Sequence, residues 1–232
     1  MCRFKSFICT QPNNVFMLKD EDSHTKIIEK YNLDDMRYPE FSLITKLEVI
    51  PKKNLFSLKR EDWEVNIDQD IIPEWFNKRD KKFVGSCFFK LFKLIKKWKK
   101  TRKIEGSLDL SNTKITSLPK GLSVGGSLDL SNTQITSLPE GLSVGGFLDL
   151  RNTKITSLPE GLSVGGFLDL RNTQITSLPE GLSVGGSLDL RNTKITFLPE
   201  GLSVGGFLDL RNTQITSLPE GLSVGGKIYK DF

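Results

Sequence analysis

The sequence has little of the chemistry on which most catalytic and metal sites are built. Its 232 residues include one histidine, His24, and three cysteines, none of them in a CxxC pair. A histidine-rich zinc site is therefore excluded, and a Ser/His/Asp triad would have to be built around His24. This histidine follows acidic residues in DEDSHTK at an expected helix start, which is typical of an exposed position. We expect no catalytic residue, no metal site and no cofactor.

The motifs that bind calcium or phosphate are missing as well. The acidic stretches DEDSH and IDQD lack the glycine and the terminal glutamate of an EF-hand loop. Glycine pairs such as Gly125-Gly126 recur in every repeat without a following Gly-Lys-Ser/Thr, so they are not phosphate-binding loops. The sequence therefore favours a non-enzymatic protein.

A membrane span and an export signal are also lacking. The best apolar run, FVGSCFF at residues 83–89, is far shorter than the roughly 18 residues that a spanning helix needs. The first residues, MCRFKSFICTQ, have no apolar core with a small-residue cleavage site, and the cysteines have no disulfide-framework spacing. We expect a cytoplasmic protein. In a eukaryotic cell, KKWKKTRK would resemble a nuclear-import signal.

Positive charge is concentrated in one segment. The net charge is +5, yet residues 78–103 alone hold 12 lysines and arginines against one acidic residue. Apolar residues recur there at steps of three or four, and Cys87 lies among them, so the segment predicts a basic amphipathic helix with Cys87 in the core. The basic patch comprises Lys90, Lys93, Lys96, Lys97, Lys99, Lys100, Arg102 and Lys103.

Three interpretations of this helix remain open. It could cap the apolar end of the repeats that follow, bind an anionic membrane surface, or bind the phosphate backbone of a nucleic acid. Capping is compatible with the other two, because the apolar stripe can face the repeats while the lysines stay in water.

The C-terminal half is a repeat. The unit GSLDLSNTKITSLPKGLSVG recurs at a strict period of 20 residues, in six copies from Gly106 to Gly225. Each copy predicts a short LDL strand, a turn at Asn-Thr, and an irregular return containing proline and glycine. Its six apolar side chains cannot offset the ordering of twenty residues, so the copies must stack. The apolar positions of one copy are Leu128, Leu130, Ile135, Leu138, Leu142 and Val144.

The pattern LxLxxTxIxxLPxxL resembles the leucine-rich repeat, and its length and Leu-Pro step resemble the short bacterial type. The resemblance implies an α/β solenoid of six units that binds another protein through its strand face. Two departures stand out: threonine replaces the usual asparagine or cysteine after the strand, and glycine opens the unit in place of leucine. The glycine predicts a corner where neighbouring backbones approach closely. A right-handed parallel β-helix is the alternative fold.

Stacked strands would align equivalent residues in rows on the strand face. Serine or phenylalanine forms one row, aspartate a second, and serine or arginine a third, all expected to face outward. Aromatic and arginine side chains carry much of the energy at protein interfaces. A solvated, self-neutralising surface is the alternative interpretation of the charged rows. The partner-binding candidates are Phe147, Phe167, Phe207, Asp149, Asp169, Asp209, Arg151, Arg171, Arg191 and Arg211.

Residues before the helix predict a small α+β domain. RFKSFICTQPNNVFMLK predicts a hairpin, HTKIIEKYNL a helix, and FSLITKLEVIP and DWEVNIDQD two further strands. EDWEVNIDQDIIPEWF resembles an N-terminal segment of bacterial and phage proteins with similar repeat arrays, which implies no activity. The expected parts are residues 1–77, the helix at 78–105, the solenoid at 106–226 and a tail at 227–232.

These observations predict a protein-interaction module that acts through the strand face, as a monomer. The alternative function is a basic peripheral adaptor, in which the helix at residues 78–103 binds membrane or nucleic acid and the repeats form a rigid arm.

Overall fold

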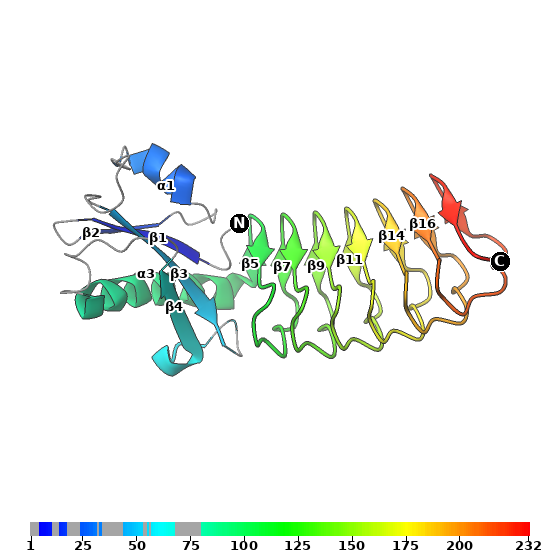
Figure 1. Ribbon diagram of the computed structural model, residues 1–232, viewed down its shortest axis with the longest axis horizontal. Coiled ribbons are helices and arrows are strands. Elements are labelled where there is room, and N and C mark those ends of the chain that lie inside the picture. The colour runs from blue at the N-terminus through cyan, green and yellow to red at the C-terminus, as the bar shows by residue number, and fades with distance from the viewer. Residues whose placement is uncertain are drawn as a thin grey trace. The chain divides into compact units, whose positions relative to one another are not determined.

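The computed structural model describes residues 5–10, 14–17, 24–31, 33, 44–52, 55, 57–67 and 80–232. The chain forms two compact units that meet in sequence between Thr101 and Arg102. The first unit contains an antiparallel sheet and two helices, and the second contains the repeats (Figure 1).

The sheet of the first unit has four antiparallel strands in the order β2-β1-β3-β4. The strands are β1 (Lys5–Thr10), β2 (Asn14–Phe16), β3 (Ile44–Pro51) and β4 (Trp63–Ile67), and a short 3₁₀ helix, η2 (Arg60–Asp62), precedes β4. The predicted hairpin and the two later strands are confirmed.

Helices α1 (His24–Tyr31) and α3 (Asp80–Thr101) pack on opposite faces of this sheet. Ile27 of α1 packs against Ile8 of β1. Phe92 of α3 contacts Trp63, whose strand position places it on the other face, with ring centroids 6.4 Å apart. Cys87 of α3 is buried in the core, as expected, and forms no disulfide.

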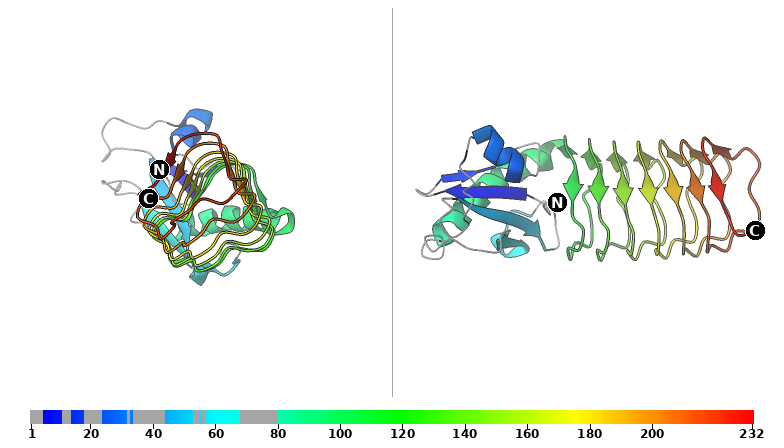
Figure 2. Two further views of the ribbon diagram at one scale, coloured as in Figure 1. Left: turned by 90° about the vertical axis from the view of Figure 1, so that its right-hand side faces the viewer. Right: turned by 45° about the horizontal axis from the view of Figure 1, so that its top comes forward.

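The repeats form a parallel β-solenoid from Lys103 to Tyr229, in which each 20-residue unit is one rung (Figure 2). Every rung contributes a strand to each of two seven-stranded parallel sheets. The Leu-Asp sheet consists of β6 (Leu108–Asp109), β8 (Leu128–Asp129), β10 (Leu148–Asp149), β12 (Leu168–Asp169), β14 (Leu188–Asp189), β16 (Leu208–Asp209) and β18 (Ile228–Tyr229). The Ser-Val sheet consists of β5 (Lys103–Ile104), β7 (Ser123–Val124), β9 (Ser143–Val144), β11 (Ser163–Val164), β13 (Ser183–Val184), β15 (Ser203–Val204) and β17 (Ser223–Val224).

The solenoid confirms the stacking of the units but corrects the expected α/β class, because it is a parallel β-helix, the alternative fold, with two strands in each unit where one was expected. The return segment carries a second strand at Ser-Val, and residues 102–232 contain no helix. The solenoid also begins before Gly106 and takes in Ile228 and Tyr229 of the expected tail. Whether α3 caps the solenoid concerns contact between the two units and stays a prediction.

The interior of the solenoid is filled by the six apolar positions of each rung. The six side chains predicted from the second unit are all at most 7% exposed. The threonine after the strand is buried with them, and its hydroxyl donates to the carbonyl three residues earlier, as Thr153 does to Leu150 at 2.7 Å. The buried hydroxyl therefore finds its partner within its own rung.

Asparagine forms a ladder here, but on the outside of the coil. The asparagines before the buried threonines have φ angles near +57°, a left-handed conformation that asparagine tolerates better than most residues. Their amides bond from rung to rung: Asn172 Nδ2 donates to Asn152 Oδ1 at 2.9 Å, and Asn192 donates likewise to Asn172. Asparagine thus shapes the turn and links neighbouring rungs.

The glycine pair forms the tight corner that its position predicts. A Cβ added at Gly185 would lie 2.3 Å from the carbonyl oxygen of Gly165 in the preceding rung. A Cβ at Gly186 would lie 2.7 Å from the carbonyl carbon of Gly166. Only glycine fits where adjacent backbones approach this closely.

Candidate binding surface

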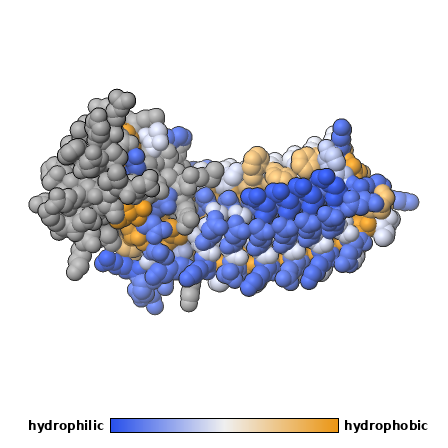
Figure 3. Space-filling view, in the orientation of Figure 1, coloured by the Kyte–Doolittle hydropathy of each residue, from blue (hydrophilic) through white to orange (hydrophobic). Residues whose placement is uncertain are grey.

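The outer surface of the Leu-Asp sheet, called the strand face below, carries the predicted rows. Strand register is strict, with Leu148 opposite Leu168 and Asp149 opposite Asp169, so equivalent residues of successive rungs are neighbours. Figure 3 shows a hydrophilic band along the solenoid with hydrophobic patches beside it. The predicted alignment of the rows is therefore confirmed.

The phenylalanine row is a continuous aromatic strip. Phe147 is 59% exposed and meets Phe167 edge to face, with centroids 6.3 Å apart. Phe167 also reaches Phe207 at 5.9 Å, although a whole rung separates them, because Ser187 leaves the space between them open. These contacts fix the rings relative to one another and leave apolar surface in water.

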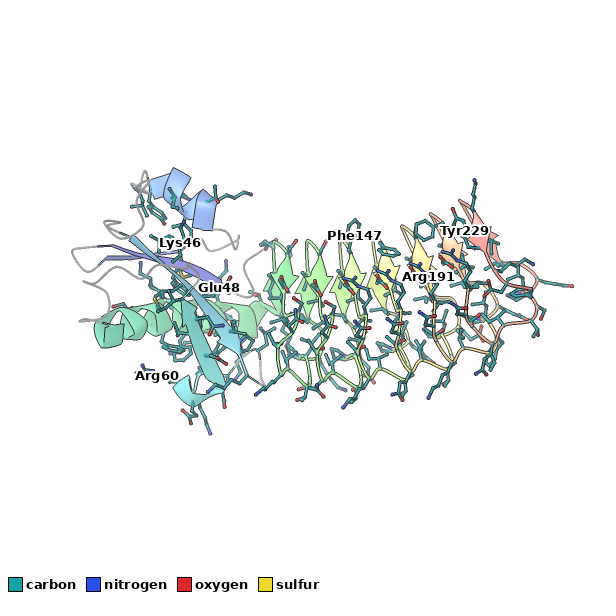
Figure 4. All side chains as sticks on the ribbon, in the orientation of Figure 1. Lys46, Glu48, Arg60, Phe147, Arg191 and Tyr229 are labelled. Atoms are coloured by element: carbon teal, nitrogen blue, oxygen red, sulfur yellow. The ribbon has the colours of Figure 1, made fainter. Side chains whose placement is uncertain are left out.

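Tyr229 extends this strip by one more ring, which the sequence analysis missed. Its ring lies 6.0 Å from Phe207 and is 41% exposed. Figure 4 shows Phe147 and Tyr229 projecting from the strand face. The 20-residue register places Tyr229 opposite Asp209, in the aspartate row, so the sequence could indicate an outward ring on β18 but not its contact with Phe207.

Serine is a structural alternative to phenylalanine in this row. Where the row residue is serine, its hydroxyl accepts the backbone N–H of the next rung, as Ser127 does from Phe147 and Ser187 from Phe207, both at 3.0 Å. Serine therefore strengthens the link between rungs, whereas phenylalanine supplies exposed aromatic surface.

The aspartates and arginines form one continuous ion-pair ladder. An arginine of the ladder bonds the aspartate of its own rung and, up to the fifth rung, reaches the aspartate of the next: Arg171 Nη2 lies 2.5 Å from Asp169, and its Nε lies 3.4 Å from Asp189. Arg151 and Arg191 do the same in their rungs. Figure 4 shows Arg191 on the strand face.

The ladder ends at the sixth rung. Arg211 pairs with Asp209 at 2.6 Å, and its guanidinium carbon lies 5.3 Å from the centre of the Tyr229 ring. The tyrosine stands where the next aspartate would be, so a cation-π contact replaces the second ion pair.

The ladder corrects the expectation that the aspartates face outward. Asp169, Asp189 and Asp209 are at most 2% exposed, because the arginines of two rungs cover each of them. Asp149 keeps a side-chain exposure of 20%, since the rung before it has Ser131 in place of an arginine. Asp169 and Asp209 are therefore buried counter-ions that a partner cannot touch.

Each carboxylate also holds the turn that follows its strand. Oδ1 of Asp189 accepts the backbone N–H of Arg191 at 3.1 Å, and Asp129 accepts that of Ser131 at 2.8 Å. This bond is present with or without an arginine in the rung. The aspartate row therefore has a conformational role in every unit, to which the later rungs add the ion pairs.

Hydrogen bonding in the ladder favours the charged forms of its arginines and of Asp209. The hydrogen bond to aspartate raises the pKa of each ladder arginine, with burial acting in the opposite direction. Burial also raises the pKa of Asp209, but hydrogen bonds from the side chain and backbone of Arg211 outweigh it. The pKa of Asp209 therefore lies below its ordinary value of 3.8.

This shift predicts loss of stability in acid. A carboxylate whose pKa is lower in the folded state stabilises the fold above its ordinary pKa, and that contribution disappears as the pH falls through the folded value. We expect the urea midpoint of the wild-type chain to exceed that of Asp209→Asn at about pH 6, and the difference to narrow towards about pH 2. Unfolding followed by circular dichroism at both pH values checks this; a constant difference would contradict it.

The basic patch divides between the two units. Lys90, Lys93, Lys96, Lys97, Lys99 and Lys100 lie on α3 and are exposed. Arg102 and Lys103 belong instead to the start of the solenoid. Arg102 has a φ of 54°, which ends the helix, and its guanidinium donates to the carbonyl of Lys120, so the expected single basic helix stops at Thr101.

The sequence analysis also considered the cysteines, His24 and two acidic stretches as possible catalytic or metal-binding groups, and several of these lie outside the described residues. Cys2, residues 20–23 of DEDSH and residues 68–70 of IDQD lie outside the described residues, as do the side chains of His24 and Cys9. Among the residues that the structure describes, no histidine, cysteine and carboxylate side chains cluster in a way that could hold a metal ion. No helix in the described ranges has both the length and the hydrophobicity needed to cross a bilayer.

Comparison of the sequence with protein-family models and with curated proteins finds no match.

Proposed function

We propose that the solenoid is a non-enzymatic protein-binding module that uses the third to sixth rungs of the strand face. The observation that carries this proposal is the exposed aromatic strip of Phe147, Phe167, Phe207 and Tyr229 beside the arginine ladder. Aromatic and arginine side chains are the types that dominate binding energy at interfaces. Both are held in place before binding, which lowers the entropy lost on association.

The arginines retain hydrogen-bonding capacity for a partner. A guanidinium has five N–H donors, and the contacts with aspartate use those on Nε and Nη2. Within the solenoid, no described bond of Arg171 or Arg191 uses Nη1, and both side chains are about a third exposed. A partner with carboxylates next to aromatic or aliphatic groups would complement this surface.

The family resemblance remains part of the proposal. The Leu-x-Leu strand and the Leu-Pro step support a relation to short leucine-rich repeats, and a cytoplasmic monomer is the setting that we propose. The second strand of each rung and the buried threonine are where this solenoid departs from that pattern.

The test replaces phenylalanine by the residue that other rungs already have. We expect Phe147→Ser, Phe167→Ser and Phe207→Ser together to abolish capture of the protein that the full-length wild type binds in a lysate of its native cell. Folding should be preserved, because Ser127 and Ser187 occupy equivalent positions and bond the next rung. Quantitative pulldown, with thermal unfolding of each variant, measures both properties.

The control is Phe197→Ser. Phe197 is 56% exposed, but it lies on the return segment, where the other five units have serine. It should bind as the wild type does. Unchanged capture by the triple variant, or equal loss in the control, would refute the assignment of the strand face.

A further inference from the structure

The exposed side of α3 carries a feature that the proposed function does not use. With successive residues about 100° apart around a helix, Phe89, Lys93, Lys96 and Lys100 lie within about 40° of the direction opposite Leu91. Leu91 is fully buried, whereas Phe89 is 74% exposed and the three lysines are exposed. Lys90 and Lys97 flank this group on one side and Lys99 on the other. We call these seven residues the lysine face.

The orientation of the lysine face is fixed by the packing of α3 on its sheet. The Phe88 and Phe92 rings are tilted against each other with centroids 5.5 Å apart, Phe92 contacts Trp63, and the guanidinium of Arg60 lies 5.3 Å from the centre of the Phe88 ring. These contacts hold one side of the helix against the first unit. Because these contacts prevent α3 from rotating, Phe89 cannot turn towards the core, and its ring stays in water.

We propose that the lysine face binds the anionic surface of a phospholipid bilayer, with Phe89 inserted at the level of the headgroups. Lysines next to an anionic leaflet are attracted to it, and the attraction is diffuse, so it needs no matched partner for each charge. An aromatic ring among them can leave water for the interface. The helix is about 33 Å long and would lie along the membrane plane.

The composition of the face favours a membrane over a nucleic acid. Every basic residue of α3 is lysine. The lysine face has no arginine, whose planar guanidinium suits bidentate phosphate and base contacts, and no asparagine or glutamine, which read adenine. A phosphate backbone would use the lysines but would leave Phe89 in water, whereas a bilayer uses both.

The test measures co-sedimentation of the full-length chain with vesicles at about 150 mM salt, where exposed charges are screened beyond about 8 Å. We expect binding to vesicles of phosphatidylcholine with phosphatidylserine and none to phosphatidylcholine alone. Lys93→Gln, Lys96→Gln and Lys100→Gln together should weaken binding by roughly 100-fold. Phe89→Ser should weaken it by roughly tenfold.

Two control variants distinguish an effect of the lysine face from an effect of the total charge or hydrophobicity of the protein. Lys114→Gln, Lys154→Gln and Lys194→Gln also remove three charges, at solenoid positions where alternate units already have glutamine. Phe197→Ser removes an exposed ring elsewhere. Both should bind vesicles nearly as the wild type does. Absence of binding to anionic vesicles, equal losses in the two lysine triples, or tighter binding to duplex DNA than to anionic vesicles at the same salt would each overturn the proposal.

Discussion

Replacing Gly185 by alanine should destabilise the solenoid by about 3 kcal/mol or more, although it adds one methyl group. The new Cβ would lie 2.3 Å from the carbonyl oxygen and 3.0 Å from the carbonyl carbon of Gly165. Both are backbone atoms. They cannot move aside, because Gly185 donates to Val164 and Gly186 to Gly166 in the same preceding rung, both at 3.0 Å. Relief of the clash would therefore break hydrogen bonds between rungs.

The matched control for this variant is Gly181→Ala in the same unit. Gly181 has a φ of +65°, but a Cβ there would meet nothing within 4 Å. Gly181→Ala should lower the free energy of unfolding by about 1 to 2 kcal/mol, because alanine is strained in the left-handed conformation. Urea unfolding of both variants, followed by circular dichroism, compares them directly. If Gly181→Ala were the more damaging, close approach of the rungs would not be what selects glycine at the corner.

Most features of the rung, including its glycine corner, could be predicted from the sequence. The 20-residue period fixes which residues become neighbours, so the buried leucines, the rows and the close approach at glycine could all be predicted. The Ser-Val strand could not. Leu162, Ser163 and Val164 alternate as Leu-Asp-Leu does, but Gly161 precedes them and the glycine pair follows, and flanking glycines indicate a loop or turn. The strand at Ser163–Val164 depends on hydrogen bonds to the rungs on either side.

The burial of the aspartates was not predicted either, because it too depends on contacts between neighbouring rungs. Alternation along the strand places Phe167, Asp169 and Arg171 on the same side, and that placement suggested three exposed rows. Exposure is decided instead by Arg151 and Arg171, which fold back over Asp169 from two different rungs. The repeat spacing predicts which side chains are neighbours, whereas packing decides their rotamers and which of them bury others. The candidate site therefore keeps its phenylalanines and arginines but loses the buried aspartates.

A consequence of this burial is that aspartates in the same row should differ in their contribution to stability. We expect Asp189→Ala to destabilise the solenoid by about 3 kcal/mol, against about 1 kcal/mol for Asp129→Ala. Asp189 is 1% exposed and is paired with Arg191 at 2.6 Å and Arg171 at 3.4 Å. Asp129 is half-buried, and the residue two positions on is Ser131.

Asp189→Asn separates the two roles of the carboxylate. Its amide oxygen can still accept the backbone N–H of Arg191, now bonded to Oδ1 at 3.1 Å, but its negative charge is lost. Its urea midpoint should therefore fall between those of the wild type and Asp189→Ala, and the gap to the wild type should change little as salt is added, because salt screens buried ion pairs only weakly. Equal midpoints for Asp189→Ala and Asp129→Ala would mean that the turn alone explains the aspartate row. A larger loss for Asp189→Ala would instead show that the ion pairs with Arg171 and Arg191 stabilise the later rungs beyond what the turn contributes.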